Sequence, residues 1–353
     1  MRILDIYIGK VIASTTFITL AVFVSLSSVI KFVEQLNLVG RGNYDISHVA
    51  LFVLYAVPRD VEIFFPMSTL IGGLIGIGMM ASNSELIVMQ SAGLSRLDII
   101  KSVMKTAAIM ILVSMAIGEW LAPQGEAASR QIRAQALSGG SFVSSKNGLW
   151  AKDGDYFVHI AEVQAKGTLK DIQIYRFNEQ LKLDSWISAE SALYNEDHWR
   201  LLNVIETTVN AESVISEKID EKVWQSSLTP NKLSVITPES LSLSGLSEYL
   251  EYLADNDQDT SRYLLAFWRK IVQPFTVAVM LFVALSFIFG PLRSVSMGAR
   301  IMMGVATGIL FHLSNQVMGS MSLVYQLHPF MGAIMPSVLF VSMAFYFMNK
   351  RPS

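Results

Sequence analysis

The sequence predicts an α+β membrane protein with six transmembrane helices, three on each side of an inserted, strand-rich aqueous domain. Two observations carry this prediction: six long apolar runs, and a polar stretch at 123–267 in which apolar and polar positions alternate. Each run holds roughly the 20 apolar residues that a helix needs to cross ~30 Å of hydrocarbon. The runs lie within Ile8–Leu36, Val49–Met80, Ile99–Ala122, Ile271–Phe289, Met297–Met318 and Leu323–Met348.

Charge divides the chain into the same parts, for which we expect the boundaries 1–122, 123–267 and 268–353. The middle part carries 13 Lys and Arg against 21 Asp and Glu, a net charge near −8, whereas the two apolar parts together are near +6. An acidic surface repels a polyanion, so the middle domain argues against a nucleic-acid partner. The sequence has no cysteine, which excludes disulfides and thiol chemistry.

Lysine and arginine are concentrated in alternate loops between the apolar runs, which is typical of cytoplasmic loops. Arg41 is the one basic residue between the first two runs, and none lies between Met318 and Phe330. We therefore expect both termini in the cytoplasm and the middle domain on the opposite side. The basic residues of the expected cytoplasmic segments are Arg2, Lys10, Arg96, Lys101, Lys105, Arg293, Arg300, Lys350 and Arg351.

The second run is too long for a simple span. As one helix, Val49–Met80 would be about 48 Å long, and it contains Pro58–Glu62, whose three charges would be costly at mid-bilayer. We expect the true span at Ile63–Met80 and an interfacial or tilted outer segment at 49–57. Small-xxx-small spacings, which we expect to pack helices within the chain, occur at Gly72/Gly76 and Gly304/Gly308.

The loop between the second and third runs predicts a short helix near 84–92, held between two membrane helices. Ser82 with Glu85, and Ser95 with Asp98, have the spacing of capping boxes. Gly93 suits the position that closes a helix. The apolar residues of this helix would be exposed, either on lipid headgroups or in the groove of a partner protein, and we favour the partner.

A polar helix is expected to continue from the third run as far as Gly139 and Gly140. The apolar period then changes to two at 148–163 and again at 171–177, 182–194 and 198–209. Short strands at this spacing predict an antiparallel sandwich or roll, followed by a helix near 240–254. Either an apolar cleft or a plain hydrophobic core in such a fold would use the same residues, which are Trp150, Phe157, Ile172, Ile174, Trp186 and Trp199.

Motifs for autonomous chemistry are missing from the sequence. It has no phosphate-binding G-x-x-x-x-G-K-[ST], no H-E-x-x-H and no G-x-S-x-G, and its five histidines are scattered singly. We expect neither an enzyme nor a resident cofactor or metal. A pump without an energy source of its own needs an external one. If the chain is part of a pump, the short cytoplasmic helix is the natural place for the partner that supplies energy.

Five segments spread over nearly the whole chain resemble the lipopolysaccharide export permease family (F/G type) of Gram-negative inner membranes, and most of all its G-type branch. They are VIKFVEQLNLVGRGNYD, FFPMSTLIGGLIGIGMMASNSELIVMQSAGLSR, IGEWLAPQGE, GLWAKDGDYFVHI and SFIFGPLRSVSMGAR. The resemblance implies six spans with a periplasmic antiparallel β-jellyroll domain, and pairing with a homologous F-type permease subunit. It also implies a dimeric cytoplasmic ATP-binding subunit, which binds the ATP and Mg. The assembly would extract lipopolysaccharide and pass it to a periplasmic jellyroll bridge protein and its membrane-anchored relative.

The resemblance also implies roles for individual residues. Contacts to the ATPase are expected from Glu85, Leu86, Met89 and Gln90 of the short helix. Lipopolysaccharide carries phosphates at the membrane surface, which call for fixed cations there. The candidates are Lys31, Arg41, Arg130 and Arg133. The alternatives are that Lys31 snorkels or pairs with Glu34, and that Arg130 or Arg133 pairs with Glu126.

A function of another class stays open at this point: a non-transporting membrane scaffold that anchors the periplasmic domain and recruits assembly factors. ATP-driven movement of lipid by the purified assembly would separate the two. A mechanotransmission or lipoprotein-release permease is a third alternative. That class carries its periplasmic domain after the first span, whereas here the domain follows the third. The part played by the jellyroll domain, conduit or gate, also stays open.

Overall fold

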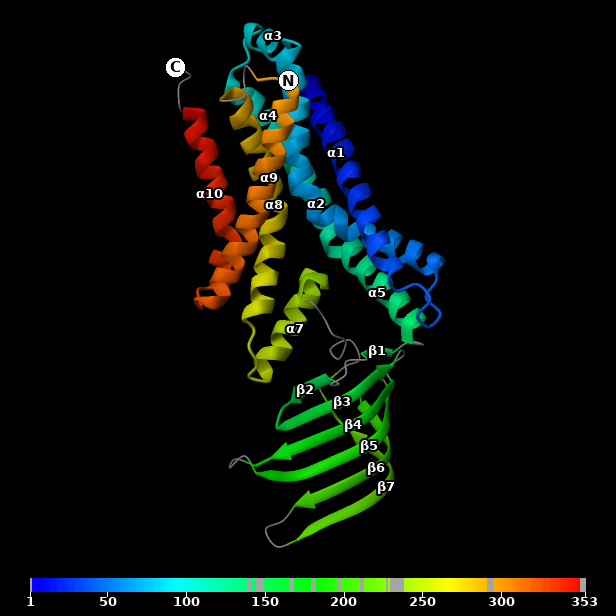
Figure 1. The fold of residues 1–353 in the computed structure, drawn as a ribbon. Coiled ribbons are helices and arrows are strands. Elements are labelled where there is room, and N and C mark those ends of the chain that lie inside the picture. Colours follow the sequence, from blue (N-terminus) through cyan, green and yellow to red (C-terminus); the bar gives the residue numbers. More distant parts are fainter. Residues whose placement is uncertain are drawn as a thin grey trace.

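The computed structural model describes residues 2–138, 141–143, 149–164, 168–178, 182–195, 198–209, 213–226, 228, 238–290 and 295–349. A bundle of long helices occupies one end of the molecule and a β-sheet occupies the other (Figure 1). The start of α1 and the end of α10 both lie at the end of the bundle remote from the sheet (Figure 1). The predicted break at Gly139 and Gly140 lies outside the described residues.

Among the described residues, six helices are long and apolar enough to cross a membrane. Three precede the sheet in the chain and three follow it, so the predicted arrangement of a multi-pass α+β membrane protein is confirmed. Their bounds are α1 Arg2–Leu36, α2 Ile46–Ser82, α4 Arg96–Ala116 continued by η1 Ile117–Leu121 and α5 Ala122–Ser138, α8 Ser261–Phe289, α9 Met297–Val324 and α10 Pro329–Asn349.

Helix α2 is a single helix of 37 residues, although Pro58 and Pro66 each remove a backbone donor from its interior. Its acidic residues Asp60 and Glu62 are both buried, at 3% exposure, and therefore face neighbouring helices. The bundle thus supplies the polar partners that lipid would not. The placement of 49–57 at a membrane surface stays a prediction.

The third spanning helix changes its winding where α4 meets α5. Pro123 has no N–H, and its ring crowds the carbonyl of Glu119, four residues earlier. The chain responds with one π-helical turn, η1, in which the amide of Ala122 donates to the carbonyl of Ile117. This turn directs Gly118 and Glu119 toward neighbouring elements, with consequences described below.

The short helix predicted between α2 and α4 is present as α3 (Glu85–Ser91). The predicted capping box of Ser82 with Glu85 is wrong, because α2 continues through Ser82, whose hydroxyl donates back to a carbonyl of α2. The capping box of Ser95 with Asp98 is confirmed at the start of α4.

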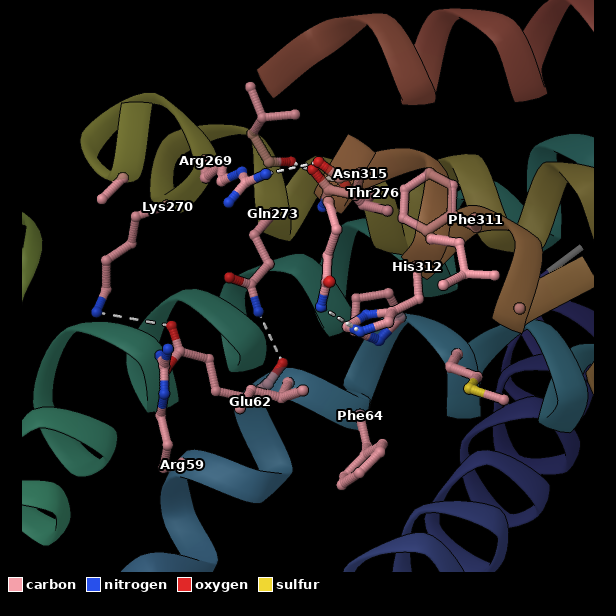
Figure 2. Close-up of a pocket in the computed structure, with 18 of the residues that line it drawn as sticks. Arg59, Glu62, Phe64, Arg269, Lys270, Gln273, Thr276, Phe311, His312 and Asn315 are labelled. Atoms are coloured by element: carbon pink, nitrogen blue, oxygen red, sulfur yellow. Dashed lines mark hydrogen bonds and ion pairs between the residues drawn. The ribbon is translucent and has the colours of Figure 1, made fainter. Parts of the chain in front are cut away.

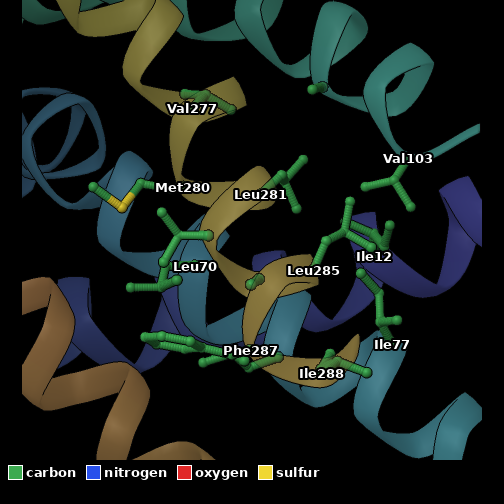
Figure 3. Close-up of a cluster of buried hydrophobic side chains, with 14 of the residues drawn as sticks. Ile12, Leu70, Ile77, Val103, Val277, Met280, Leu281, Leu285, Phe287 and Ile288 are labelled. Atoms are coloured by element: carbon green, nitrogen blue, oxygen red, sulfur yellow. The ribbon is translucent and has the colours of Figure 1, made fainter. Parts of the chain in front are cut away.

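The core of the bundle is made of aliphatic side chains from α1, α2, α4 and α8 (Figure 3). Ile12, Leu74, Val103 and Leu285 are fully buried there. The buried Arg300 of α9 reaches the end of α2 nearest α3, where it donates to the carbonyl of Gly78 at 2.9 Å. Dense packing of this kind fixes the relative positions of the four helices.

The paired glycines pack helices within the chain, as predicted. A Cβ on Gly72 would lie 2.5 Å from the Cα of Thr16, so α1 and α2 approach closely at this point. On α9, a Cβ on Gly304 or Gly308 would meet side chains of α2 at 2.7 and 2.8 Å. A larger residue at these positions would separate the helices.

The middle domain is one seven-stranded antiparallel sheet with the order β1-β3-β4-β5-β6-β7, in which β2 pairs with β3. Its strands are β1 Ser141–Val143, β2 Leu149–Asp153, β3 Tyr156–Gln164, β4 Thr168–Phe177, β5 Leu183–Asn195, β6 His198–Val209 and β7 Val214–Trp224. The predicted strands are therefore confirmed in a single jellyroll-like sheet, while β1 and β7 were not predicted. Residues of β7 are exposed on both faces, so the strand carries no apolar alternation.

The two faces of this sheet differ. Ile172, Ile174 and Trp199 are buried in the core on one face. Trp150, 59% exposed, and Phe157, 41% exposed, belong to the other face. The prediction that these residues line one cleft together is therefore wrong, because neighbouring positions on a strand point to opposite faces.

Helix α7 (Leu243–Asp255) follows the sheet and confirms the predicted helix near 240–254. Tyr252 and Leu253 at its far end belong to the buried core of the sheet. Burial, with the Asp153 carboxylate nearby, raises the pKa of Tyr252 to about 12. The near end of α7 faces the helix bundle (Figure 1).

Candidate functional site

A cavity of about 1000 Å³ lies within the half of the bundle nearest the sheet. Its walls come from α1, α2, α8, α9 and α10. The rim on the side of the sheet comes from Leu246 of α7 and Pro238 of η2 (Pro238–Ser240). Most of the lining is apolar, including Phe23, Phe64 and Phe311. A cavity of this size between helices is a typical ligand site.

Cations outnumber anions in the cavity lining. The charged lining residues are Lys31, Glu34, Arg59, Glu62, Arg262, Arg269 and Lys270, that is, five bases against two acids. Because apolar walls screen charge poorly, this excess produces a positive potential inside. The cavity therefore suits a ligand that is anionic at one end and apolar elsewhere.

Lys31, predicted as a substrate contact, lines the cavity and is held by α2. Its Nζ lies 2.6 Å from Oδ1 of Asp60, and Ser27 donates to the other carboxylate oxygen at 3.1 Å. The side chain of Asp60 is only 4% exposed, so it needs a cation. Of the alternatives, pairing with Glu34 is not what the structure shows. The Lys31 side chain remains 29% exposed, which leaves part of the ammonium open to the cavity.

Glu62, also on α2, gathers a second group of charges at the cavity (Figure 2). Arg59 Nη1 lies 2.5 Å and Lys270 Nζ lies 3.6 Å from its carboxylate oxygens. Gln273 donates to the Glu62 backbone carbonyl at 2.8 Å. Two cations thus share one carboxylate, and this group keeps one positive charge that Glu62 does not neutralise.

On the α8–α9 side, Arg269 Nη2 donates to the Asn315 carbonyl at 2.6 Å (Figure 2). The guanidinium passes directly over Gly319, where a Cβ would lie 1.9 Å from Nη2. Only glycine leaves room for this arginine. His312 contacts Gln316 at 3.0 Å on the same wall.

The other three predicted substrate contacts lie outside the lining of the cavity. Arg41 is exposed in the turn after α1. Arg130 pairs with Glu126 at 2.9 Å, which is the alternative weighed from helical spacing. The Arg133 guanidinium lies 5.5 Å from the ring centroid of Phe52 on α2. The structure brings only Lys31 into the cavity, and the roles of the other three stay predictions.

The predicted ATPase-contact residues divide between two faces of α3. Leu86 and Met89 are buried in the bundle core, so the expectation that they are exposed is wrong. Ile87 and Val88, at 59% and 64% exposure, form the apolar surface of the helix. Gln90 is also exposed. The carboxylate of Glu85 accepts a hydrogen bond from Tyr7 of α1 at 2.8 Å.

Sequence reasoning missed Arg59, Glu62, Arg269, Lys270 and Gln273 as cavity residues. The available signal was the presence of ionisable residues next to or within apolar runs, which marks functional sites in membrane proteins by default. Within the described residues, no group of three or more His, Asp and Glu could hold a metal ion.

Comparison with known proteins agrees with this architecture. The family model of the lipopolysaccharide export system permease LptF/LptG matches residues 6–350. The chain is 46% identical over 354 residues to the lipopolysaccharide export system permease protein LptG of Escherichia coli strain K12, covering 99% of this chain and 98% of that protein.

It is 47% identical over 352 residues to the protein of the same name from Haemophilus influenzae, again covering 99% and 98%. It is also 25% identical over 155 residues to the permease protein LptF of E. coli K12, covering 40% of this chain and 42% of that protein. The chain therefore belongs to the family of lipopolysaccharide export system permeases LptF/LptG, as the five segments of its sequence predict.

Proposed function

We propose that this chain is the transmembrane permease subunit of an ATP-driven transporter that extracts lipopolysaccharide from the inner membrane and passes it toward the outer membrane. The single observation that carries the proposal is the cavity, with its apolar walls and excess of cations. Lipopolysaccharide carries phosphates on its sugar headgroup, and its acyl chains are attached to that same headgroup. Phosphates would bind the cations as charge-assisted pairs, and acyl chains would lie on the apolar walls.

Energy would come from a dimeric ATP-binding subunit docked on α3. The exposed Ile87 and Val88 offer an apolar anchor for a groove, and Glu85 and Gln90 offer polar contacts beside it. A homologous F-type subunit would complete the transporter. A periplasmic jellyroll bridge protein and its membrane-anchored relative would receive the lipid.

The proposed function implies one orientation of the chain in the Gram-negative inner membrane. Both termini and α3 would be cytoplasmic, and the sheet would be periplasmic. The excess of Lys and Arg in the loops at the α3 end supports this orientation. The cavity would then open near the outer leaflet, where extraction has to begin.

Purification of the assembly from native membranes tests the proposal. Mass analysis should find an F-type subunit, an ATP-binding subunit and lipopolysaccharide, and proteoliposomes should release the lipid only with ATP. The matched variants are Lys31→Met in the cavity and Lys218→Met on the exposed sheet surface. Release should fall only in the first. Release that ignores ATP, or an assembly without glycolipid, would favour the scaffold function instead.

A further inference from the structure

Helix α7 connects the cavity to the sheet. At its far end, the Tyr252 hydroxyl donates to the Lys152 carbonyl at 2.8 Å, and Asn256 Oδ1 accepts from the Gly154 amide at 2.8 Å. Both partners belong to the β2–β3 hairpin. A displacement of α7 would therefore be transmitted to the sheet.

The near end of α7 is tied to the bundle by Glu119 of the π-helical turn. The carboxylate of Glu119 accepts from the Leu243 amide at 2.8 Å and from the Ser244 hydroxyl at 2.9 Å. These groups belong to the first turn of α7, where the helix dipole also stabilises a negative charge. Glu119 therefore ties the first turn of α7 to the π-helical turn.

Lys270 provides the second tie. Its Nζ donates to the carbonyl of Leu241, just before α7, at 2.6 Å. The same ammonium lies 3.6 Å from the Glu62 carboxylate and belongs to the cavity lining. One ammonium group therefore serves both the cavity and the attachment of the sheet.

The π-helical turn keeps Glu62 in place between these groups. A Cβ on Gly118 would lie 3.0 Å from Glu62 Oε1, so the carboxylate sits against the helix backbone. Because Arg59 also binds this carboxylate, Glu62 satisfies Lys270 only in part. An anion in the cavity is a stronger acceptor for the Lys270 ammonium than the neutral Leu241 carbonyl.

We infer that an anionic headgroup in the cavity competes with Leu241 for Lys270 and so loosens α7, which couples loading of the cavity to the position of the sheet. The inference rests on the proposed function, since the headgroup is taken to be a lipid phosphate. It adds a mechanism by which the sheet responds to cargo before any nucleotide is used.

Spin labels provide the test, because the chain has no cysteine of its own. Cysteines would replace Asp220 on β7 and Leu327 in the turn between α9 and α10, both exposed. The distance distribution would be measured on the full assembly in nanodiscs without nucleotide. The probes are lipopolysaccharide and the same lipid after removal of its phosphates. The assembly without the two introduced cysteines, treated with the same label, gives the background signal.

The phosphorylated lipid should shift the distance distribution, and the dephosphorylated lipid should not. Lys270→Met without lipid should reproduce the shifted distribution and respond no further to lipid. Lys218→Met, the exposed control on the sheet surface, should leave both the lipid-free distribution and the response to lipid unchanged. Equal responses to both lipids, or an unshifted Lys270→Met, would overturn the inference.

Native mass spectrometry of the same samples separates the two proposals. Bound lipid without a shift would contradict the coupling alone. Absence of bound lipid would contradict the proposed function, and Lys270→Met would still decide whether Lys270 holds α7. If that variant failed to assemble, the comparison of the two lipids on the unaltered chain would decide the coupling.

Discussion

The two ends of the helix bundle are built on different principles. At the α3 end, the aliphatic side chains of Ile12, Leu74 and Leu285 are fully buried against one another. At the sheet end, α1, α2 and α8 instead present Lys31, Glu62 and Lys270 around a cavity of about 1000 Å³. The same three helices build both ends.

This difference shows how one set of helices serves two tasks. Close packing at the α3 end fixes the helices relative to one another, since a packed core deforms little. At the sheet end, ion pairs across an open space can exchange partners with a ligand. A force applied at α3 would thus be transmitted through the rigid end to the adaptable one.

The largest expected effect lies in the packed end. Leu74→Ala should lower the free energy of unfolding by about 2–5 kcal/mol, because it removes contacts and leaves a cavity. Thermal unfolding in detergent measures the change. Leu310→Ala on α9, where the side chain is 59% exposed, is the control and should change it by less than about 0.5 kcal/mol. Equal losses would mean that Leu74 contributes no more packing energy than an exposed residue.

The next effect separates stability from transport at the cavity. Lys31→Met should cost about 2 kcal/mol, because it leaves Asp60 buried without its cation, and partial exposure of Lys31 softens the loss. The double variant with Asp60→Asn should recover most of the stability.

Lipid release should stay reduced by about tenfold in both of these variants, since each would lack the charged contact to phosphate that we propose for Lys31. Release assays in proteoliposomes, compared with unfolding data, measure the two effects separately. Recovery of release in the double variant would assign Lys31 a structural role only.

A smaller effect is expected at the π-helical turn. Alanine for glycine in a helix usually stabilises by up to about 1 kcal/mol. Gly118→Ala should instead destabilise by about 1 kcal/mol, because its Cβ would press on the Glu62 carboxylate at 3.0 Å. Gly298→Ala on α9 meets nothing within 4 Å and is the matched control. A gain in unfolding temperature for both variants would contradict the close contact.

The smallest effect concerns the start of α2. Hydrogen bonds from the Ser47 hydroxyl and the His48 amide hold the pKa of Asp45 well below its usual value of 3.8. A lowered pKa in the folded state means that this stabilisation is present above pH 3.8 and is lost as the pH falls further.

Hydrogen exchange of the first amides of α2 should therefore accelerate below pH 3.8, relative to Asp45→Asn, which keeps the cap but cannot titrate. The comparison between the two proteins at each pH removes the intrinsic dependence of exchange on acid. Identical profiles would show that the cap does not depend on the charge.

Local rules predicted much of the fold. The six apolar runs, the alternation in β2 to β6 and the Ser95–Asp98 capping box all depend on residues close in sequence. The box at Ser82 failed for the opposite reason, because a longer helix continued through it. The sequence did not predict β7, because the strand has no apolar pattern of its own and is held in the sheet by pairing with β6.

The site was harder to predict because its contacts join distant helices. Lys31 was identified, but its partner Asp60 lies on α2. The contact of Glu62 with Lys270 depends on how α2 packs against α8, and neither segment's sequence indicates that the other lies beside it. The tie between Lys270 and Leu241 also requires the position of α7, which only the folded chain supplies.

The continuous run from α4 through η1 to α5 has a mechanical consequence. The 17 residues of α5 extend the spanning helix by roughly 25 Å toward the sheet. A rod of that length acts as a lever, so a tilt of roughly 10° at the membrane would swing its far end by about 4 Å. Small rearrangements inside the lipid would in this way become large excursions of the domain outside it.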